Sequence, residues 1–465
     1  MRRIARLLAG AGIAVVALVA TAAPASAHGV GGRGDLPLPL WQFTWGAAFA
    51  VLISFAALGL LWTRPRLRRA STGRELPRSV DRALWYLAVP GRILALALAL
   101  VTVGAALFGD QSPAANLSPV AVYVVFWVGL QVVSAVLGDV WRAISPFDTI
   151  AAIAARVRAA IVGGPPPGPA PEQAPAGETL WPAAAGLAGF AWLELAYHDP
   201  SSPRIIGIAA VVYTAAVLGV CARRGRAWLR AGEGFGVLFG LLAHLSPFYR
   251  DERGRLRARV PFSGLAALEA RRGTVAVVMV VLGSTTFDGL GRTRFWGDVV
   301  ADRTGWDLTA MNTVGLLWTI GLVWLGYLAA TRLTARLTDE EPGTLADTYV
   351  GSLIPIVLAY TIAHYFSLVV FEGQTFVFHL SDPFGQGWDL FGTSSWEINF
   401  LLVSVGAIAW VQALSIVAGH VVGVTAAHDR SVERFSPTQA VRSQYPMLAL
   451  MVAYTVVGLT LLLGA

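Results

Sequence analysis

The side chains best suited to chemistry gather in one stretch of the sequence, residues 349–430, where two apolar runs flank a polar loop. Four of the seven histidines lie there: His364, His379, His420 and His428. An ionisable side chain at membrane depth is costly, so it needs a partner, a water-filled cavity or a function. This stretch is therefore the first candidate for a functional site.

The first group of candidate residues combines imidazoles with carboxylates. His364 and His379 offer ring nitrogens, and Asp288, Glu372 and Asp382 offer oxygens. Such ligands suit zinc or a similar divalent ion, which can turn a bound water into a nucleophile near neutral pH. In this hypothesis the histidines bind the metal and the carboxylates act as catalytic ligand or general base. Further polar residues expected at the same membrane surface are Glu194, His198 and Gln374.

Two alternatives for this group stay open. The same residues could handle protons instead of a metal. They could also be structural, with His364 bonded to a carbonyl of a neighbouring helix, because no compact metal motif such as HExxH is present. A separate copper site at His28, with its freed α-amine, is also conceivable, but the favoured interpretation is that His28 simply follows a cleavage site.

A second group forms a stripe along one predicted helix. Gln412, His420 and His428 recur every eight residues, which places them on one helical face. Gln412 and His420 could line a polar path for a solute, which is the transport alternative to catalysis. For His428 and the two residues after it, Asp429 and Arg430, we expect an ordinary helix end.

Two small residues lie beside this stripe. Gly419 and Gly423 are four residues apart, and such spacing lets another helix approach closely. The sequence therefore predicts a tight helix contact next to His420.

The composition indicates a membrane protein. Of 465 residues, 55% are hydrophobic and only 14% are charged, against about 25% in soluble domains. The net charge of +7 comes from arginine alone, since the sequence has no lysine. The arginines concentrate between the apolar runs, which favours membrane topology over nucleic-acid binding. The single cysteine, Cys221, excludes an internal disulfide and a multi-cysteine metal site.

The pattern of apolar runs predicts an all-α, polytopic protein with about ten transmembrane helices after a signal peptide at residues 1–27. The predicted spans are 40–62, 93–109, 119–137, 181–197, 205–222, 274–286, 314–333, 350–371, 398–427 and 447–464. Arginine-rich loops alternate with arginine-poor ones, so both termini are expected outside the cytoplasm and the protein in the plasma membrane.

The chain is expected to have two membrane parts. Residues 28–160 form the front part, with three spans and an interfacial helix, and residues 181–465 form the back part, with seven spans. A Pro/Gly/Ala-rich cytoplasmic linker, 161–180, joins them. Residues 235–245 are apolar but too short to cross, so they are predicted to be interfacial or re-entrant.

Seven segments carry a likeness to known proteins. They are HGVGGRGDLPLPLW (28–41), LGDVWRAISPF (137–147), FDGLGRTRFW (287–296), AHYFSLVVFEGQ (363–374), SDPFGQGWDLFGT (381–393), GHVVGVTAAHDR (419–430) and SQYPMLALMVAYTVVGL (443–459). Through them the chain resembles a group of actinobacterial multi-pass membrane proteins labelled fenitrothion hydrolase. The resemblance implies metal-assisted hydrolysis of an organophosphate triester at an extracytoplasmic-facing site, and it carries over no catalytic residue. The competing classes are a secondary transporter or channel for a small solute, and a membrane scaffold without turnover.

Overall fold

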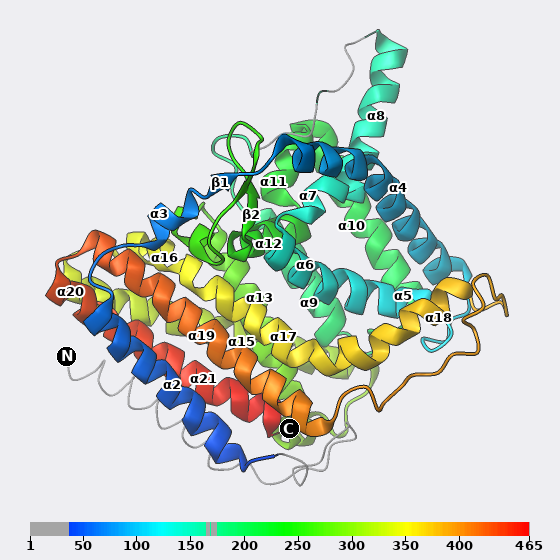
Figure 1. Cartoon of the computed structure of the whole chain (residues 1–465). Helices are drawn as coiled ribbons and strands as arrows, with labels where there is room; N and C mark the ends of the chain where they lie inside the picture. The colour runs from blue at the N-terminus through cyan, green and yellow to red at the C-terminus, as the bar shows by residue number, and fades with distance from the viewer. Residues whose placement is uncertain (1–36, 164–167, 169–173, 465) are drawn as a thin grey trace.

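The computed structural model describes residues 37–163, 168 and 174–464, and Figure 1 shows the whole chain. The predicted all-α fold is confirmed, with 75% of the structure helical. Nine helices of the described part are long and apolar enough to cross a bilayer. The predicted signal peptide and His28 lie outside the described residues, as do residues 164–167 and 169–173 of the linker.

The nine candidate spans follow one another through the whole described chain. Their bounds are α2 (Leu40–Leu61), α4 (Arg78–Phe108), the run of α5 (Leu117–Pro119), the π-helical η2 (Val120–Gly129) and α6 (Leu130–Leu137), then α10 (Pro203–Arg224), α13 (Thr274–Gly291), α15 (Gly305–Thr338), the run from α16 (Pro342–Tyr349) through η6 (Val350–Leu353), α17 (Ile354–Phe371) and η7 (Glu372–Gln374) to α18 (Thr375–Ser381), α19 (Val405–Arg434), and α20 (Pro437–Arg442) with α21 (Tyr445–Leu463).

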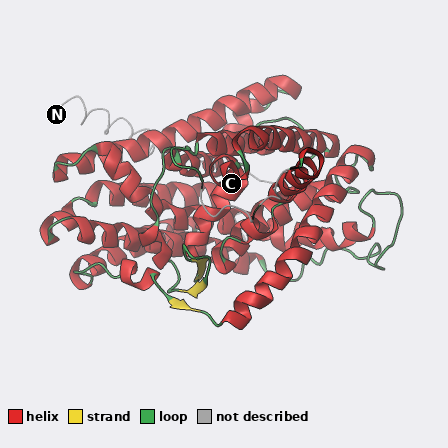
Figure 2. Ribbon diagram, turned by 90° about the horizontal axis from the view of Figure 1, so that it is seen from above, coloured by secondary structure: helices red, strands yellow, loops and turns green. Residues whose placement is uncertain are grey.

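Shorter elements connect these spans. They are α3 (Leu67–Ser71), β1 (Arg74–Glu75), α7 (Val140–Ile144), α8 (Pro146–Val162), α9 (Trp181–Leu195), η3 (Arg226–Trp228), α11 (Leu229–Gly232), α12 (Gly234–Leu242), η4 (Ala243–Leu245), β2 (Phe248–Arg250), β3 (Leu256–Ala258), η5 (Ser263–Ala267) and α14 (Arg294–Val300). The three strands form one small antiparallel sheet in the order β1-β3-β2, seen at one edge of the molecule in Figure 2.

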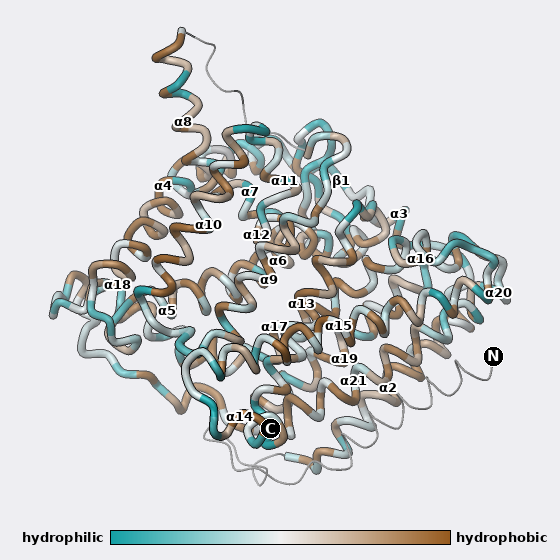
Figure 3. Tube along the Cα trace, turned by 180° about the vertical axis from the view of Figure 1, so that it is seen from behind, coloured by the Kyte–Doolittle hydropathy of each residue, from teal (hydrophilic) through white to brown (hydrophobic). Residues whose placement is uncertain are grey.

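The helices pack around a shared apolar core. In Figure 1, α2, α19 and α21 run side by side, with α17 next to α19, and each of these neighbours is in contact. On the other side α4 packs on α10, and α8 projects away from the body. Figure 3 shows apolar residues along the long helices and polar residues concentrated toward their ends and in the loops. This distribution is the one that a bilayer requires of spanning helices.

Several predicted boundaries differ from the observed ones. The predicted fourth span forms α9, whose 15 residues fall short of the roughly 20 needed to cross. The second span begins earlier, at Arg78, because helical hydrogen bonding continues where hydropathy ends. The ninth begins later, at Val405, because the Ser404 side chain accepts a hydrogen bond from the Ala407 amide and caps the helix there.

The short apolar helix α12 lies inside the protein. Most of its side chains are buried against α6 and α9, which favours the re-entrant over the interfacial alternative. Glu233 caps it and accepts hydrogen bonds from the Phe235 and Gly236 amides, from Trp141 Nε1 and from the Tyr213 hydroxyl. With four donors around it, this buried carboxylate has a structural role.

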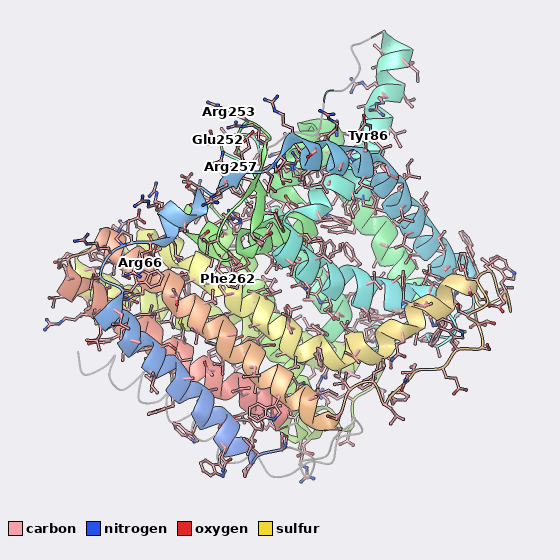
Figure 4. The ribbon with its side chains drawn as sticks, in the orientation of Figure 1. Arg66, Tyr86, Glu252, Arg253, Arg257 and Phe262 are labelled. Atoms are coloured by element: carbon pink, nitrogen blue, oxygen red, sulfur yellow. The ribbon has the colours of Figure 1, made fainter. Side chains whose placement is uncertain are left out.

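One carboxylate outside the spans ties the tip of the β2–β3 turn. Asp251 Oδ1 accepts hydrogen bonds from the Arg255 amide at 2.9 Å and the Arg253 amide at 3.0 Å. Figure 4 shows Arg253 at this exposed tip. The hydrogen bond from the Arg255 backbone amide in particular holds the pKa of Asp251 below its ordinary value.

We expect the β2–β3 turn to loosen in acid. Because the folded-state pKa is lowered, the stabilisation is present above the ordinary carboxyl pKa of about 3.9 and is lost as pH falls through the folded value. Hydrogen exchange of residues 251–258, corrected for intrinsic rates, should accelerate at low pH in the wild type. In Asp251→Asn the corrected exchange should be fast already at neutral pH and nearly independent of pH. Equal pH profiles for the two proteins would contradict this account.

Candidate functional site

Three helices bring acidic and basic side chains together inside the bundle. Asp288 lies near the C-terminal end of α13, His364 in the middle of α17, and Glu194 at the end of α9. Helix α13 packs against both α9 and α17, so it is the element that unites them. These were three of the residues expected near one membrane surface.

The closest contact joins an imidazole to a carboxylate. His364 Nε2 lies 2.5 Å from Asp288 Oδ2, and both side chains are largely buried. Among the described residues, His364 Nε2 has no well-aligned hydrogen-bond partner, and its contact with Asp288 is an ion pair only when the imidazole is protonated. On the other carboxylate oxygen, Arg292 Nε lies 3.4 Å away, and this arginine side chain is 56% exposed. Asp288 therefore lies between the interior histidine and a solvent-facing cation.

A second acid reaches the same place through a tyrosine. The Tyr365 hydroxyl donates a hydrogen bond of 3.0 Å to Glu194 Oε1. The Tyr365 ring meets the His364 ring edge-on, with centroids 4.9 Å apart. We call Glu194, Asp288, His364 and Tyr365 the four-residue cluster.

A cavity of about 20 Å³ adjoins the four-residue cluster at His364. It is lined by Thr285, Thr286, Gly289, Tyr360, His364, Tyr454, Val457, Gly458, Leu461 and Leu462. A space of roughly 10–15 Å³ admits one water molecule if polar partners are present. The threonine and tyrosine hydroxyls already bond within the protein, so they offer a water their remaining acceptor lone pairs beside the His364 ring. The cavity can thus hold a single water beside His364.

His420 lies beyond the tyrosines that line this cavity. It is fully buried, and its ring centroid is 6.2 Å from that of Tyr360 and 6.5 Å from that of Tyr454. His420 Nδ1 is 2.8 Å from the Ile416 carbonyl, which can only accept, so Nδ1 carries the proton. Nε2 is then a proton acceptor, and it has no partner among the described residues. Gln412 is half-buried two turns away on the same helix.

The other predicted metal ligands do not join the cluster. In the part of the chain that the structure describes, no three His, Cys, Asp or Glu side chains are close enough to hold a metal ion. Helix α17 continues through η7 into α18, so His379 lies about 22 Å along the chain from His364 at 1.5 Å per residue. Glu372 is exposed on η7. Asp382 accepts hydrogen bonds from the Gln386 and Gly387 amides and shapes the loop.

Two further residues of the expected group lie nearby in other roles. His198 Nδ1 is 2.9 Å from the Thr309 hydroxyl, which ties the end of α9 to α15. The Gln374 side chain pairs with the backbone of Asn399 and fixes the loop after α18. Both are structural contacts.

His428 and Asp429, expected at an ordinary helix end, are instead buried and hydrogen-bonded inside the protein. The His428 ring donates from Nε2 to the Trp62 carbonyl at 3.0 Å and accepts at Nδ1 from Gln444 at 3.0 Å. Asp429 Oδ1 accepts from Trp62 Nε1 at 2.8 Å and from the Arg66 amide at 2.6 Å. They fasten the turn after α2 to α19 and do not form a solvated helix end.

The structure reveals participants that the sequence analysis missed. Tyr365 was one of many aromatic residues in an apolar run, and only its neighbour His364 marked the position. Arg292 was counted among loop arginines, although its spacing of four residues from Asp288 on a helix was a usable signal.

No known family, curated protein or solved structure matches this chain in the comparisons made with each.

Proposed function

We propose that this polytopic α-helical membrane protein is a proton-coupled secondary transporter, in which Asp288 and His364 bind and release the coupling proton. The observation that carries the proposal is the 2.5 Å contact between these buried side chains on two packed spans. Paired acidic and imidazole groups inside membrane bundles characterise proton relays in pumps and transporters.

The surroundings of the pair suit proton transfer. On one side Asp288 is next to the half-exposed Arg292. On the other side His364 and Tyr360 line the cavity, and the His420 ring, whose Nε2 has no partner among the described residues, lies next to Tyr360. A proton entering from solvent at Asp288 can pass to His364, and a water in the cavity extends the path inward. When His364 is protonated, its positive charge balances the negative charge of Asp288. When the proton leaves, a buried carboxylate charge remains, and this favours another arrangement of the helices.

The triester hydrolysis implied by the resemblance is the second candidate. An aspartate–imidazole pair can act as a general base toward water, which the same geometry would permit. The cavity of about 20 Å³ holds a water but not a triester. A proton path needs room only for water, so this space suits proton transfer better than triester binding. In both candidates the cluster is expected at the extracytoplasmic face, as the arginine content of the loops predicts.

The test is solute-dependent proton flux in proteoliposomes that contain a pH-sensitive dye. We expect a panel of small solutes to include one that drives proton movement with the wild type. Flux should fall to the level of protein-free liposomes in Asp288→Asn and in His364→Gln. Asp302→Asn is the matched control, because Asp302 is an exposed acid in the connection between α13, which carries Asp288, and α15.

Two results would overturn the transport proposal. One is flux that survives both cluster substitutions. The other is triester cleavage by the purified wild type, abolished by Asp288→Asn, with no solute-driven proton flux. The second outcome would establish the hydrolase candidate, and thermal melting of each variant would show that the fold is intact.

A further inference from the structure

A strongly basic hollow lies at the end of α2, far along the chain from the four-residue cluster. It has a volume of about 480 Å³ and is lined by Thr63, Arg64, Pro65, Arg66, Arg69 and Ala70. Among the described residues that line it, three of six are arginines and none is acidic. Figure 4 shows Arg66 on the turn that follows α2. The hollow therefore presents cationic groups without built-in counter-charges.

The neighbouring acids are already engaged. Glu433 forms an ion pair with Arg68, which is outside the hollow, at 2.8 Å. Asp429 is buried and accepts hydrogen bonds from the Arg66 amide and Trp62 Nε1. Neither Arg64 nor Arg69 has an ion pair within the described ranges, and both are exposed. Their charge is available to an external anion.

The floor of the hollow is held in place before any ligand arrives. The Asp429 carboxylate fixes the backbone of the turn at Arg66 and Leu67. The Arg66 guanidinium lies over the Trp62 ring, 4.9 Å from its centroid, and also donates to the Leu61 carbonyl. A fixed backbone reduces the entropy lost when an anion binds.

The apolar surface beside the hollow identifies the kind of anion. Leu60 and Leu61, the last residues of α2, are 79% and 74% exposed. Exposed leucines at the end of a spanning helix contact lipid chains, and arginines immediately beyond them reach the headgroup level. A phosphate that carries acyl chains can use both surfaces, whereas free phosphate can use only the arginines.

We propose that this hollow binds the phosphate headgroup of an anionic phospholipid, with the acyl chains along the exposed end of α2. Basic pockets at the ends of spanning helices are suited to such headgroups. The arginines bind the phosphate, and Leu60 and Leu61 contact the chains. The site is independent of the proposed proton coupling.

The test measures phosphatidylglycerol binding to the full chain in neutral detergent by native mass spectrometry, with phosphatidylcholine as reference lipid. In Arg64→Gln/Arg69→Gln we expect phosphatidylglycerol affinity to fall roughly 25-fold, about fivefold for each arginine removed. The matched control is Arg156→Gln/Arg158→Gln on α8, which removes two exposed arginines elsewhere and should change affinity less than about twofold.

A second measurement uses the wild type, so it does not depend on a variant that folds. A photoreactive phosphatidylglycerol should crosslink within residues 60–70. Crosslinks only elsewhere, or an equal loss of affinity in both double variants, would overturn the proposal. If inorganic phosphate displaces phosphatidylglycerol at equal concentration, the ligand is free phosphate and the lipid assignment is wrong.

Discussion

Replacing Gly419 by leucine is expected to destabilise the protein by about 3 kcal/mol or more, because it overpacks a close contact between α19 and α17. A Cβ atom at Gly419 would lie 2.8 Å from the Pro355 carbonyl oxygen and would also overlap the Ala359 methyl group on α17. Backbone atoms cannot move aside as a flexible side chain does, so α17 and α19 would have to separate. Thermal melting in detergent measures the effect.

A glycine in open space supplies the control. Gly321 is in the interior of α15, and a Cβ atom there would meet nothing within 4 Å. Gly321→Leu should therefore leave the melting temperature unchanged or raise it, because leucine favours the helix by close to 1 kcal/mol over glycine. The double variant Gly419→Ala/Ala359→Gly should melt at a higher temperature than Gly419→Leu. It removes the overlap with the Ala359 methyl group but keeps the close approach to the Pro355 carbonyl. Similar melting of Gly419→Leu and Gly321→Leu would contradict this contact.

The second large effect is expected at Asp429, a buried carboxylate with several donors around it. In Asp429→Ala, the Arg66 and Leu67 amides and Trp62 Nε1 lose their acceptor. A buried donor without a partner costs about 1–3 kcal/mol, so the loss should reach about 3 kcal/mol or more. Asp429→Asn keeps one acceptor oxygen and should cost about 1–2 kcal/mol.

Two readouts separate this role from a general loss of packing. Trypsin should cleave the Arg66–Leu67 bond faster in Asp429→Ala, because the turn after α2 is released from α19. Glu433→Ala is the control on the same helix face. Its ion pair with the 69%-exposed Arg68 contributes below about 1 kcal/mol, so neither melting nor cleavage should change much. Slow cleavage in Asp429→Ala would show that other contacts hold the turn.

The tight glycine contact and the four-residue cluster share one helix. Helix α17 carries His364 and packs on α19 at Gly419. One turn further along α19, a Cβ atom at Gly423 would lie 2.7 Å from the Ser352 carbonyl oxygen in η6, which leads directly into α17. A shift of α17 would change the distance between His364 and Asp288 directly. Substitutions at Gly419 should therefore reduce function as well as stability.

The sequence by itself determined the class of this protein and the position of most of its helices. Length and hydropathy along one run decide whether it can span a membrane, and both are local properties. The close approach at Gly419 and Gly423 was predicted from spacing alone and is confirmed, because a helix face without side chains always permits it. Asp288 and His364 could be selected as costly polar groups in apolar surroundings.

Only the tertiary structure decided which of these groups meet. Every candidate acid and imidazole was selected for the same local reason, as a polar residue in apolar surroundings. Whether two of them meet depends on which helix faces pack together, which is a long-range property of the whole core. The packing of α9, α13 and α17 joined Asp288 to His364. The continuation of α17 into α18 carried His379 away, and the burial of Asp429 turned an expected helix end into an internal fastening.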